Sequence, residues 1–198
     1  MSTEQLKIWN SGFGNEYTDR NTFDYHTRTS AWSTMIGDLP IKTVLEVGCN
    51  KAYNLQAIKH IRNELKLFGV EPNDYARGHA QELFGEAIHT GNATELPFQK
   101  DEIDLVFTSN VLIHVKADDL PSAINEINRV ASKYILCVEY FDQKETLIHY
   151  RGHDNALWKR DFCSWYERTL PNLKLVKNGF WNQQDNGFDD SHWWLWEK

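Results

Sequence analysis

Short apolar runs alternate with longer amphipathic stretches through the middle of the chain. The runs end at glycine, proline or polar residues, as strands do, and the stretches between them carry apolar positions at helical spacing. The expected strands are Thr43–Val47, 67–71, 87–90, Ile103–Ser109 and 134–140, and the expected helices are 51–65, 73–84 and 118–130. This alternation predicts a mostly parallel sheet that is covered by helices.

The pattern changes after residue 140. Residues 141–155 are polar and are expected to be irregular, and a helix is expected over 159–170. Two further strands are expected over 173–180 and 192–197, joined by a polar connection. Such a hairpin would complete a sheet of seven strands in which one strand is antiparallel.

The N-terminal segment is expected to be helical in pieces, with breaks at Gly12, Gly14 and Asn21. The length of 198 residues is that of one domain. We divide this single domain into an N-terminal helical lid (1–37), a central core (38–140), and a C-terminal loop and hairpin (141–198).

Composition narrows the function classes. The net charge is −7, from 21 basic and 28 acidic residues, which argues against binding along a nucleic-acid backbone. No run approaches the ~18 apolar residues of a membrane span, and the N-terminus lacks the features of a secretory signal. The cysteines suit a reduced cytoplasm rather than a disulfide framework or a zinc site; they are Cys49, Cys137 and Cys163. We expect a cytoplasmic protein with no metal, no membrane contact and no nucleic-acid partner.

The first strand-to-helix turn carries candidate chemistry. Its sequence is VLEVGCN over residues 44–50, in which Gly48 allows a tight turn and the close approach of a ligand. The turn lacks the second glycine of the dinucleotide fingerprint and the Gly-Lys-Ser/Thr of a P-loop. Glu71 ends the second strand, where an acidic side chain can accept hydrogen bonds from ribose hydroxyls. The alternative for Glu71 is a solvated carboxylate at a strand end.

In chain order, the segments VLEVGCN, FGVEPN, GNATELPF and IDLVFTSNVLIHV resemble the motifs of class I S-adenosylmethionine (SAM)-dependent methyltransferases. The resemblance covers roughly residues 43–140 and implies a three-layer, Rossmann-like α/β fold with SAM as cofactor and S-adenosylhomocysteine (SAH) as product. It implies that Glu46 and Gly48 lie at the methionine end and Glu71 at the ribose. Asn92 and Ala93 would lie beside the adenine, with Asn110 near the transferable methyl group. The cofactor-binding residues expected in all are Tyr17, Arg20, Glu46, Gly48, Cys49, Asn50, Glu71, Pro72, Asn92, Ala93, Thr94 and Asn110.

Two further features of the sequence bear on this site. Asn50 and Ala52 stand where the family often has glycine. Tyr17 and Arg20 lie in a segment that is expected to close over the cofactor, with Arg20 binding its carboxylate. Packing under the edge of the sheet is the alternative for Tyr17.

The flanking segments resemble a narrower family, the methylases associated with pseudaminic acid biosynthesis. The resembling segments are WxxxFGxEYxxRN (9–21), YRGH (150–153), LWKRDF (157–162) and DDxHWW (189–194). This resemblance implies an acceptor that is an acidic or nucleotide-linked sugar. All eight tryptophans also lie in these flanks, before residue 33 or after residue 157. They either shape an acceptor site or simply pack as large residues.

Transfer of a methyl group to a hydroxyl benefits from a positioned base. The candidates are His114, Glu139 and His153, which lie near the carboxyl ends of the last parallel strands. The alternatives are a packing or orienting role for His114 and a solvated loop position for His153. Arg151, Lys159 and Arg160 form a candidate cationic cluster, because arginine binds carboxylates and phosphates. The alternative, which we favour for Lys159, is a charge at the start of a helix or on the surface. The expected acceptor-binding residues are Tyr150, Arg151, His153 and Trp158.

These observations predict a methyltransferase that acts on an oxygen or nitrogen atom of a small polar acceptor. Two other functions stay open. One is that of a SAM-binding subunit that regulates or stabilises a partner without catalysis. The other is that of a methyltransferase that acts on another small molecule or on RNA. The sequence leaves the oligomeric state open.

Overall fold

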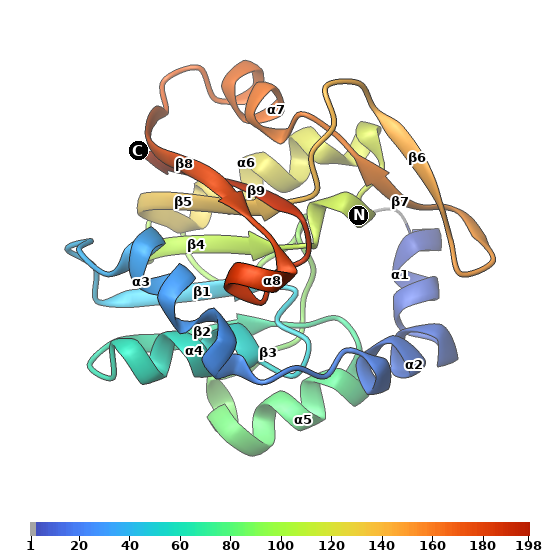
Figure 1. Cartoon of the computed structure of the whole chain (residues 1–198), viewed down its shortest axis with the longest axis horizontal. Helices are drawn as coiled ribbons and strands as arrows, with labels where there is room; N and C mark the ends of the chain where they lie inside the picture. Colours follow the sequence, from blue (N-terminus) through green and yellow to red (C-terminus); the bar gives the residue numbers. More distant parts are fainter. Residues whose placement is uncertain (1–2) are drawn as a thin grey trace.

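The computed structural model describes residues 3–198, except for the side chains of residues 3 and 153–155. Seven strands form one sheet in the order β3-β2-β1-β4-β5-β9-β8 (Figure 1). The strands of this sheet are β1 (Thr43–Val47), β2 (Lys66–Val70), β3 (Ile88–His89), β4 (Ile103–Ser109), β5 (Ala131–Glu139), β8 (Lys174–Trp181) and β9 (Ser191–Glu197). Only β9 runs antiparallel to its neighbours β5 and β8 in this sheet. The predicted fold class is therefore confirmed.

Helices cover both faces of the sheet and make three layers (Figure 1). The α-helices are α1 (Thr3–Trp9), α2 (Gly12–Arg20), α3 (Thr29–Ile36), α4 (Tyr53–Ile61), α5 (Asp74–Phe84), α6 (Leu120–Val130), α7 (Phe162–Thr169) and α8 (Gln183–Asn186). Short 3-10 helices are η1 (Tyr25–Arg28), η2 (Gly85–Ala87), η3 (Leu112–His114) and η4 (Ala117–Asp119). Apolar residues of α3, α4 and α5 form one core cluster with the sheet, and those of α6 and α7 form the other. Within the described part of the chain, no helix is long and apolar enough to cross a membrane.

The central strand β1 shows how the sequence sets the two faces. Val44 packs in the core cluster on the α4 side, whereas Leu45 and Val47 pack in the cluster on the α6 side. Successive side chains of a strand point to opposite faces, so Glu46 projects toward α4. An acidic residue is thereby buried, with 2% of its surface exposed, at the carboxyl edge of the sheet.

The helix predicted over 51–65 begins later and ends earlier, at Tyr53 and Ile61. The residues before it cannot be helical because Asn50 and Ala52 have left-handed backbones, with φ of 45° and 60°. Residues 49–52 instead form a turn after β1, in which the N–H of Ala52 donates to the carbonyl of Cys49 over 2.7 Å. The helix predicted from residue 159 likewise begins only at Phe162.

The segment predicted to be irregular, 141–155, contains most of a second, two-stranded sheet. Strands β6 (Thr146–Tyr150) and β7 (His153–Lys159) pair in antiparallel fashion. Arg151 and Gly152 form a two-residue turn between them with φ of 47° and 83°. Two positive φ values are typical of hairpin turns whose twist matches that of the strands. The hairpin was not predicted because the segment is polar. Neither strand lies in the main sheet, so neither carries the continuous apolar run that is typical of a buried parallel strand.

Helices α1 and α2 lie across the carboxyl edge of the sheet, between the β6–β7 hairpin and α5 (Figure 1). The predicted breaks at Gly12 and Gly14 are wrong, since both residues lie within α2. The interruption falls instead at Asn10 and Ser11, and the predicted break at Asn21 is confirmed. Gly14 permits close packing of the two helices, because a Cβ at this position would lie 1.8 Å from the carbonyl oxygen of Trp9.

Candidate functional site

A cavity of about 280 Å³ opens at the carboxyl ends of β1, β2 and β4. These strands are parallel, so their ends and the loops that follow meet at one edge of the sheet, where open α/β folds bind ligands. The cavity is lined by Tyr17, Arg20, Glu46, Gly48, Cys49, Asn50, Glu71, Pro72, Asn92, Ala93 and Asn110. The structure therefore brings together every predicted cofactor-binding residue except Thr94. Thr94 contacts the lining residue Asn92 instead, since its hydroxyl donates to Oδ1 of Asn92 over 2.7 Å.

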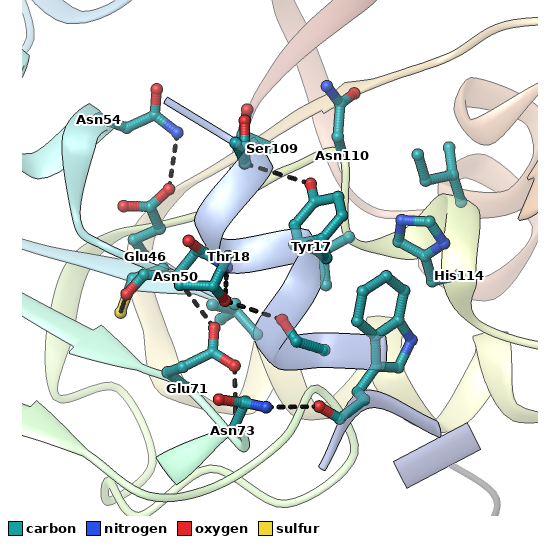
Figure 2. Close-up of a pocket in the computed structure, with 18 of the residues that line it drawn as sticks. Tyr17, Thr18, Glu46, Asn50, Asn54, Glu71, Asn73, Ser109, Asn110 and His114 are labelled. Atoms are coloured by element: carbon teal, nitrogen blue, oxygen red, sulfur yellow. Dashed lines mark hydrogen bonds between the residues drawn. The ribbon is translucent and has the colours of Figure 1, made fainter. Parts of the chain in front are cut away.

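The loop after β1 forms one wall of the cavity. Gly48 has a φ of 74°, and a Cβ at this position would lie 2.6 Å from Cγ2 of Val111. Only glycine fits both restrictions. The backbone N–H of Asn50 then donates to Oε2 of Glu71 over 2.8 Å, which ties the first loop to the end of the second strand (Figure 2).

Glu71 has a backbone-bound, buried carboxylate. Its Oε1 accepts the N–H of Asn73 over 2.9 Å, while Oε2 accepts that of Asn50. Burial raises the pKa of Glu71 to about 7, although both hydrogen bonds oppose this shift. Each carboxylate oxygen has a second lone pair, so Glu71 can also accept hydrogen bonds from a ligand in the cavity.

A hydrogen-bonded set of three side chains forms another part of the wall. Nη1 of Arg28 donates to Oδ1 of Asn54 over 3.0 Å. Nδ2 of Asn54 donates in turn to Oε1 of Glu46 over 2.7 Å (Figure 2). The Arg28 guanidinium is stacked between two aromatic rings, 3.7 Å from the centroid of Phe23 and 4.2 Å from that of Phe188. The cavity therefore offers one guanidinium and one carboxyl group that are held apart by a single amide.

Within this hydrogen-bonded set, one carboxyl oxygen of Glu46 lacks a hydrogen-bond partner in the described part of the chain. Its Oε2 is buried and has no hydrogen-bond partner among the described residues. Burial raises the pKa of Glu46 to about 8. An orphaned buried carboxylate oxygen is costly, and a ligand ammonium would satisfy it. The amino-acid end of SAM carries such an ammonium beside a carboxylate, so the residues present fit this cofactor.

Arg28 was missed by the sequence analysis, which assigned the cofactor carboxylate to Arg20. Arg20 lines the cavity, but it is partly exposed and pairs with Glu16 over 3.3 Å. Arg28 is 9% exposed and lies next to Asn54 and Glu46. No local pattern distinguishes Arg28, because its partners, such as the carbonyl of Gly187, are far away in sequence.

Helices α1 and α2 close one side of the cavity through polar contacts (Figure 2). Nδ2 of Asn73 donates to the carbonyl of Trp9 over 2.7 Å, and Nδ2 of Asn50 donates to Oγ1 of Thr18 over 3.1 Å. Tyr17 lines the cavity, and burial is the main cause that raises its pKa well above the usual value. Both loops that follow β1 and β2 are thus bonded to the N-terminal segment.

His114 lies at the end of the cavity nearest α1, as predicted for a residue beyond β4. Its Nδ1 lies 2.6 Å from the carbonyl oxygen of Ala156, so Nδ1 is the protonated nitrogen and Nε2 is left as an acceptor. The ring lies 4.5 Å, between centroids, from that of Trp9. Burial lowers the pKa of His114 to about 4. A neutral imidazole with an available Nε2 therefore faces the site at neutral pH.

Tyr150 and Arg151 also line the cavity, at the turn of the hairpin. Tyr140 and Asp189 line it as well and were not assigned a role in the sequence analysis, although Asp189 lies in the quoted segment DDxHWW. The quoted motif contained Asp189, but nothing in the sequence indicated that Asp189 lies beside the cavity.

Three predicted site residues do not fit their expected roles. Glu139 is fully buried and does not line the cavity, and its carboxylate accepts the N–H groups of residues 111–113, so the prediction that Glu139 acts as a base is wrong. Trp158 is 6% exposed and packs under the guanidinium of Arg160 rather than in the cavity. Arg160 is itself buried, with its Nε 2.6 Å from Glu145, so the cationic cluster does not form. The side chain of His153 lies outside the described residues.

No metal site accompanies these residues in the part of the chain that the structure describes, since no group of three or more His, Cys, Asp or Glu side chains there could hold an ion. The cavity is instead walled by paired polar groups, aromatic rings and backbone N–H donors.

The chain is similar to known methyltransferases in part of its sequence and in its fold. Residues 45–134 match the family described as "Methyltransferase domain". No curated protein sequence matches the chain significantly. Similar folds occur in magnesium protoporphyrin IX methyltransferase from Synechocystis PCC 6803 with bound SAH (TM-score 0.70, 15% identity, 99% of both chains covered). They also occur in 1,6-didemethyltoxoflavin-N1-methyltransferase from Burkholderia thailandensis (TM-score 0.71, 13% identity, 98% of this chain and 89% of that one).

A third similar chain comes from the complex between the Haloferax volcanii Trm112 methyltransferase activator and the putative methyltransferase. It has a TM-score of 0.67 and 14% identity, over 98% of this chain and 96% of that one. At these identities the likeness establishes the fold, and the family match covers residues 45–134 of the 198. The chain therefore has the fold of class I, SAM-dependent methyltransferases, and its central part, residues 45–134, matches a methyltransferase family.

Proposed function

We propose that the protein transfers a methyl group from SAM to an oxygen or nitrogen atom of a small polar acceptor. The observation that carries this proposal is the linked set Arg28, Asn54 and Glu46, with Glu71 on the neighbouring loop. A ligand that joins an amino acid to a nucleoside needs a cation, an anion and a ribose acceptor in one cavity. The predicted position of Arg20 at the cofactor carboxylate is replaced in this proposal by Arg28.

SAM, when bound, supplies a methyl group that is already electrophilic because it is attached to a sulfonium. Glu46 binds the ammonium through its orphaned oxygen, Arg28 binds the carboxylate, and Glu71 accepts from the ribose. Helices α1 and α2 exclude water from the cavity, which strengthens these interactions. The protein thus has to position and desolvate the acceptor rather than activate the cofactor.

We further propose that the acceptor is an acidic or nucleotide-linked sugar of the pseudaminic acid type. Its support is the resemblance of the flanking segments, together with Tyr150 and Arg151 at the rim of the cavity. The guanidinium of Arg151 can bind a carboxylate or phosphate through two parallel hydrogen bonds. His114 offers its Nε2 to a hydroxyl of the same acceptor.

The proposal is tested with methyl-labelled SAM and three kinds of acceptor: an acidic nonulosonic sugar, its nucleotide-linked form, and neutral N-acetylhexosamines. We expect label to enter an acidic sugar. Arg151→Ala should lower kcat/KM for that sugar roughly 30- to 150-fold, at unchanged SAH affinity. Arg151→Lys should recover only part of the loss, and Arg168→Ala is the matched control because Arg168 stacks on Trp165, outside the cavity.

Two results would redirect the proposal. Loss of SAH binding in Arg151→Ala would assign this arginine to the cofactor and remove the main support for an acidic acceptor. Labelling of neutral sugars alone would refute the acidic class but keep the methyltransferase.

Two alternatives make different predictions in the same assay. A SAM-binding subunit without catalysis would bind SAH but label nothing in sugars or metabolite extracts. An RNA methyltransferase would label RNA, although the net charge of −7 and the lack of a basic run argue against RNA binding by this chain alone.

A further inference from the structure

Asp189 lies in the connection between α8 and β9, and the topology of the sheet brings it to the cavity. Because β9 runs antiparallel to β5, its first residues lie at the carboxyl edge, where the ligand-binding loops meet. The register pairs Glu139 with His192, so the end of β5 lies beside the start of β9. The hydroxyl of Tyr140 donates to Oδ2 of Asp189 over 2.7 Å.

The start of β9 also touches the end of β4. Oγ of Ser191 lies 3.4 Å from Oδ1 of Asn110, and Asn110 has a left-handed backbone with φ of 56°. Asn110 is the residue that the family resemblance places near the transferable methyl group. Asp189 is two residues from Ser191, lines the same cavity and is solvent-accessible. An acidic side chain is therefore held next to the region where the acceptor must meet the methyl group.

We propose that Asp189 is a catalytic residue that binds the nucleophilic hydroxyl or amino group of the acceptor and takes its proton, and that Tyr140 positions it. The bond between the acceptor atom and the methyl carbon forms as the carbon–sulfur bond breaks, with its electron pair passing to sulfur. The proton lost by the acceptor passes to the Asp189 carboxylate. This inference deepens the proposed function and rests on it.

A competing role for Asp189 is that of counter-ion to Arg28, since the charge of Asp189 raises the pKa of Arg28. In that role Asp189 would support binding of the cofactor carboxylate and would not face the acceptor. The two roles differ in which ligand they affect. A probe that carries a cation at the methyl position separates them.

Sinefungin is such a probe, because it carries a primary amine where SAM carries the methyl group. SAH lacks any group at that position. Binding of both ligands is measured by calorimetry for the unmodified protein, Asp189→Asn, Tyr140→Phe and Asp190→Asn. Asp190 is the matched control because it is the adjacent, exposed aspartate and does not line the cavity.

We expect the unmodified protein to bind sinefungin more tightly than SAH. Asp189→Asn should weaken sinefungin binding by about tenfold or more while changing SAH affinity by less than about threefold. Tyr140→Phe should cause a smaller loss with sinefungin, because it removes only the hydrogen bond that positions Asp189. Asp190→Asn should change neither affinity.

An equal loss of both ligands in Asp189→Asn would assign the residue to Arg28 and overturn the inference. So would an unchanged ratio of the two affinities. Absence of SAH binding by the unmodified protein is a distinct result, because it would refute the proposed function itself and the inference with it.

Discussion

The loop after β1 keeps its shape although two of its three left-handed positions are not glycine. Gly48, Asn50 and Ala52 all have positive φ values. A left-handed backbone costs roughly 1–2 kcal/mol for a residue with a Cβ, less for asparagine. At Asn50 the cost is offset by two hydrogen bonds, from its N–H to Glu71 and from its amide to Thr18. The departure from glycine thus leaves the turn intact and adds a contact to the lid.

Glu71 should contribute to cofactor binding through the nucleoside part alone. We expect Glu71→Ala to weaken binding of SAH and of 5′-methylthioadenosine alike, by about 10- to 150-fold, because each lost bond to a charged acceptor is worth about 1.5–3 kcal/mol. Calorimetry on the folded variant measures both. Glu86→Ala, an exposed position in η2, is the control. Unchanged affinities would remove Glu71 from the ribose role.

Arg28 should act on the amino-acid part of the cofactor. Arg28→Gln is expected to weaken SAH binding at least about tenfold and to leave 5′-methylthioadenosine, which lacks that part, nearly unaffected. Arg20→Gln should leave SAH affinity within about threefold, because Arg20 is partly exposed and paired with Glu16. If Arg20→Gln were the more damaging change, the original assignment of the carboxylate to Arg20 would be correct.

At the scale of elements, α1 and α2 are expected to act as a lid. The residues 9–21 are joined to the cofactor loops by a few side-chain hydrogen bonds, from Asn50 and Asn73, and such segments open locally at low cost. Hydrogen exchange of the backbone amides in residues 9–21 should slow when SAH is added. Equal exchange with and without SAH would show that the segment is a fixed part of the scaffold.

Two glycines of α2 allow a matched test of how the lid is seated. A Cβ at Gly14 would lie 1.8 Å from the carbonyl of Trp9 and 2.8 Å from Nδ2 of Asn73, whereas nothing lies within 4 Å of one at Gly12. We expect Gly14→Ala to separate α1 from α2, to speed hydrogen exchange in both and to weaken SAH binding. Gly12→Ala should bind SAH normally and should stabilise the helix by about 0.5–1 kcal/mol. Equal behaviour of the two variants would rule out this packing role for Gly14.

At the scale of the whole molecule, the site is built at a cost in stability. Burial raises the pKa of Glu46 to about 8 and those of Glu71 and Glu139 to about 7. A carboxyl whose pKa is raised by folding contributes stability that is complete below its unfolded value, near 4.5, and is lost as the pH rises through the folded value. His114, with a lowered pKa, acts in the opposite sense only below about pH 6.5.

The free energy of unfolding of the cofactor-free protein should therefore fall between pH 6.5 and 8.5, by roughly 1 kcal/mol or more for each such group. Urea denaturation at these pH values measures it. Glu46→Gln should flatten the fall and stabilise the free protein at pH 8.5, while weakening SAH binding. Glu86→Gln should leave the pH dependence unchanged. A fall that is equally steep in Glu46→Gln would show that this carboxyl is ionised in the free protein.

The sequence determined the central sheet and the order of the cofactor motifs. Strands Thr43–Val47 and Ile103–Ser109 were predicted with their observed bounds, because buried parallel strands are continuous apolar runs that end abruptly. Gly48 and Glu71 were recognised for a related reason, since each follows such a run at the edge where parallel strands end. These features are local, so the residue types and their spacing are enough to predict them.

Only the tertiary structure decided which charges face the cavity. Arg28 reaches the carbonyl of Gly187 across 159 positions of sequence, and Asp189 meets Tyr140 only because β9 runs antiparallel to β5. Glu139, by contrast, ends a strand at the same edge but turns its carboxylate into the core. Side-chain burial and long-range pairing depend on how distant elements pack, and no local pattern of residues encodes that packing.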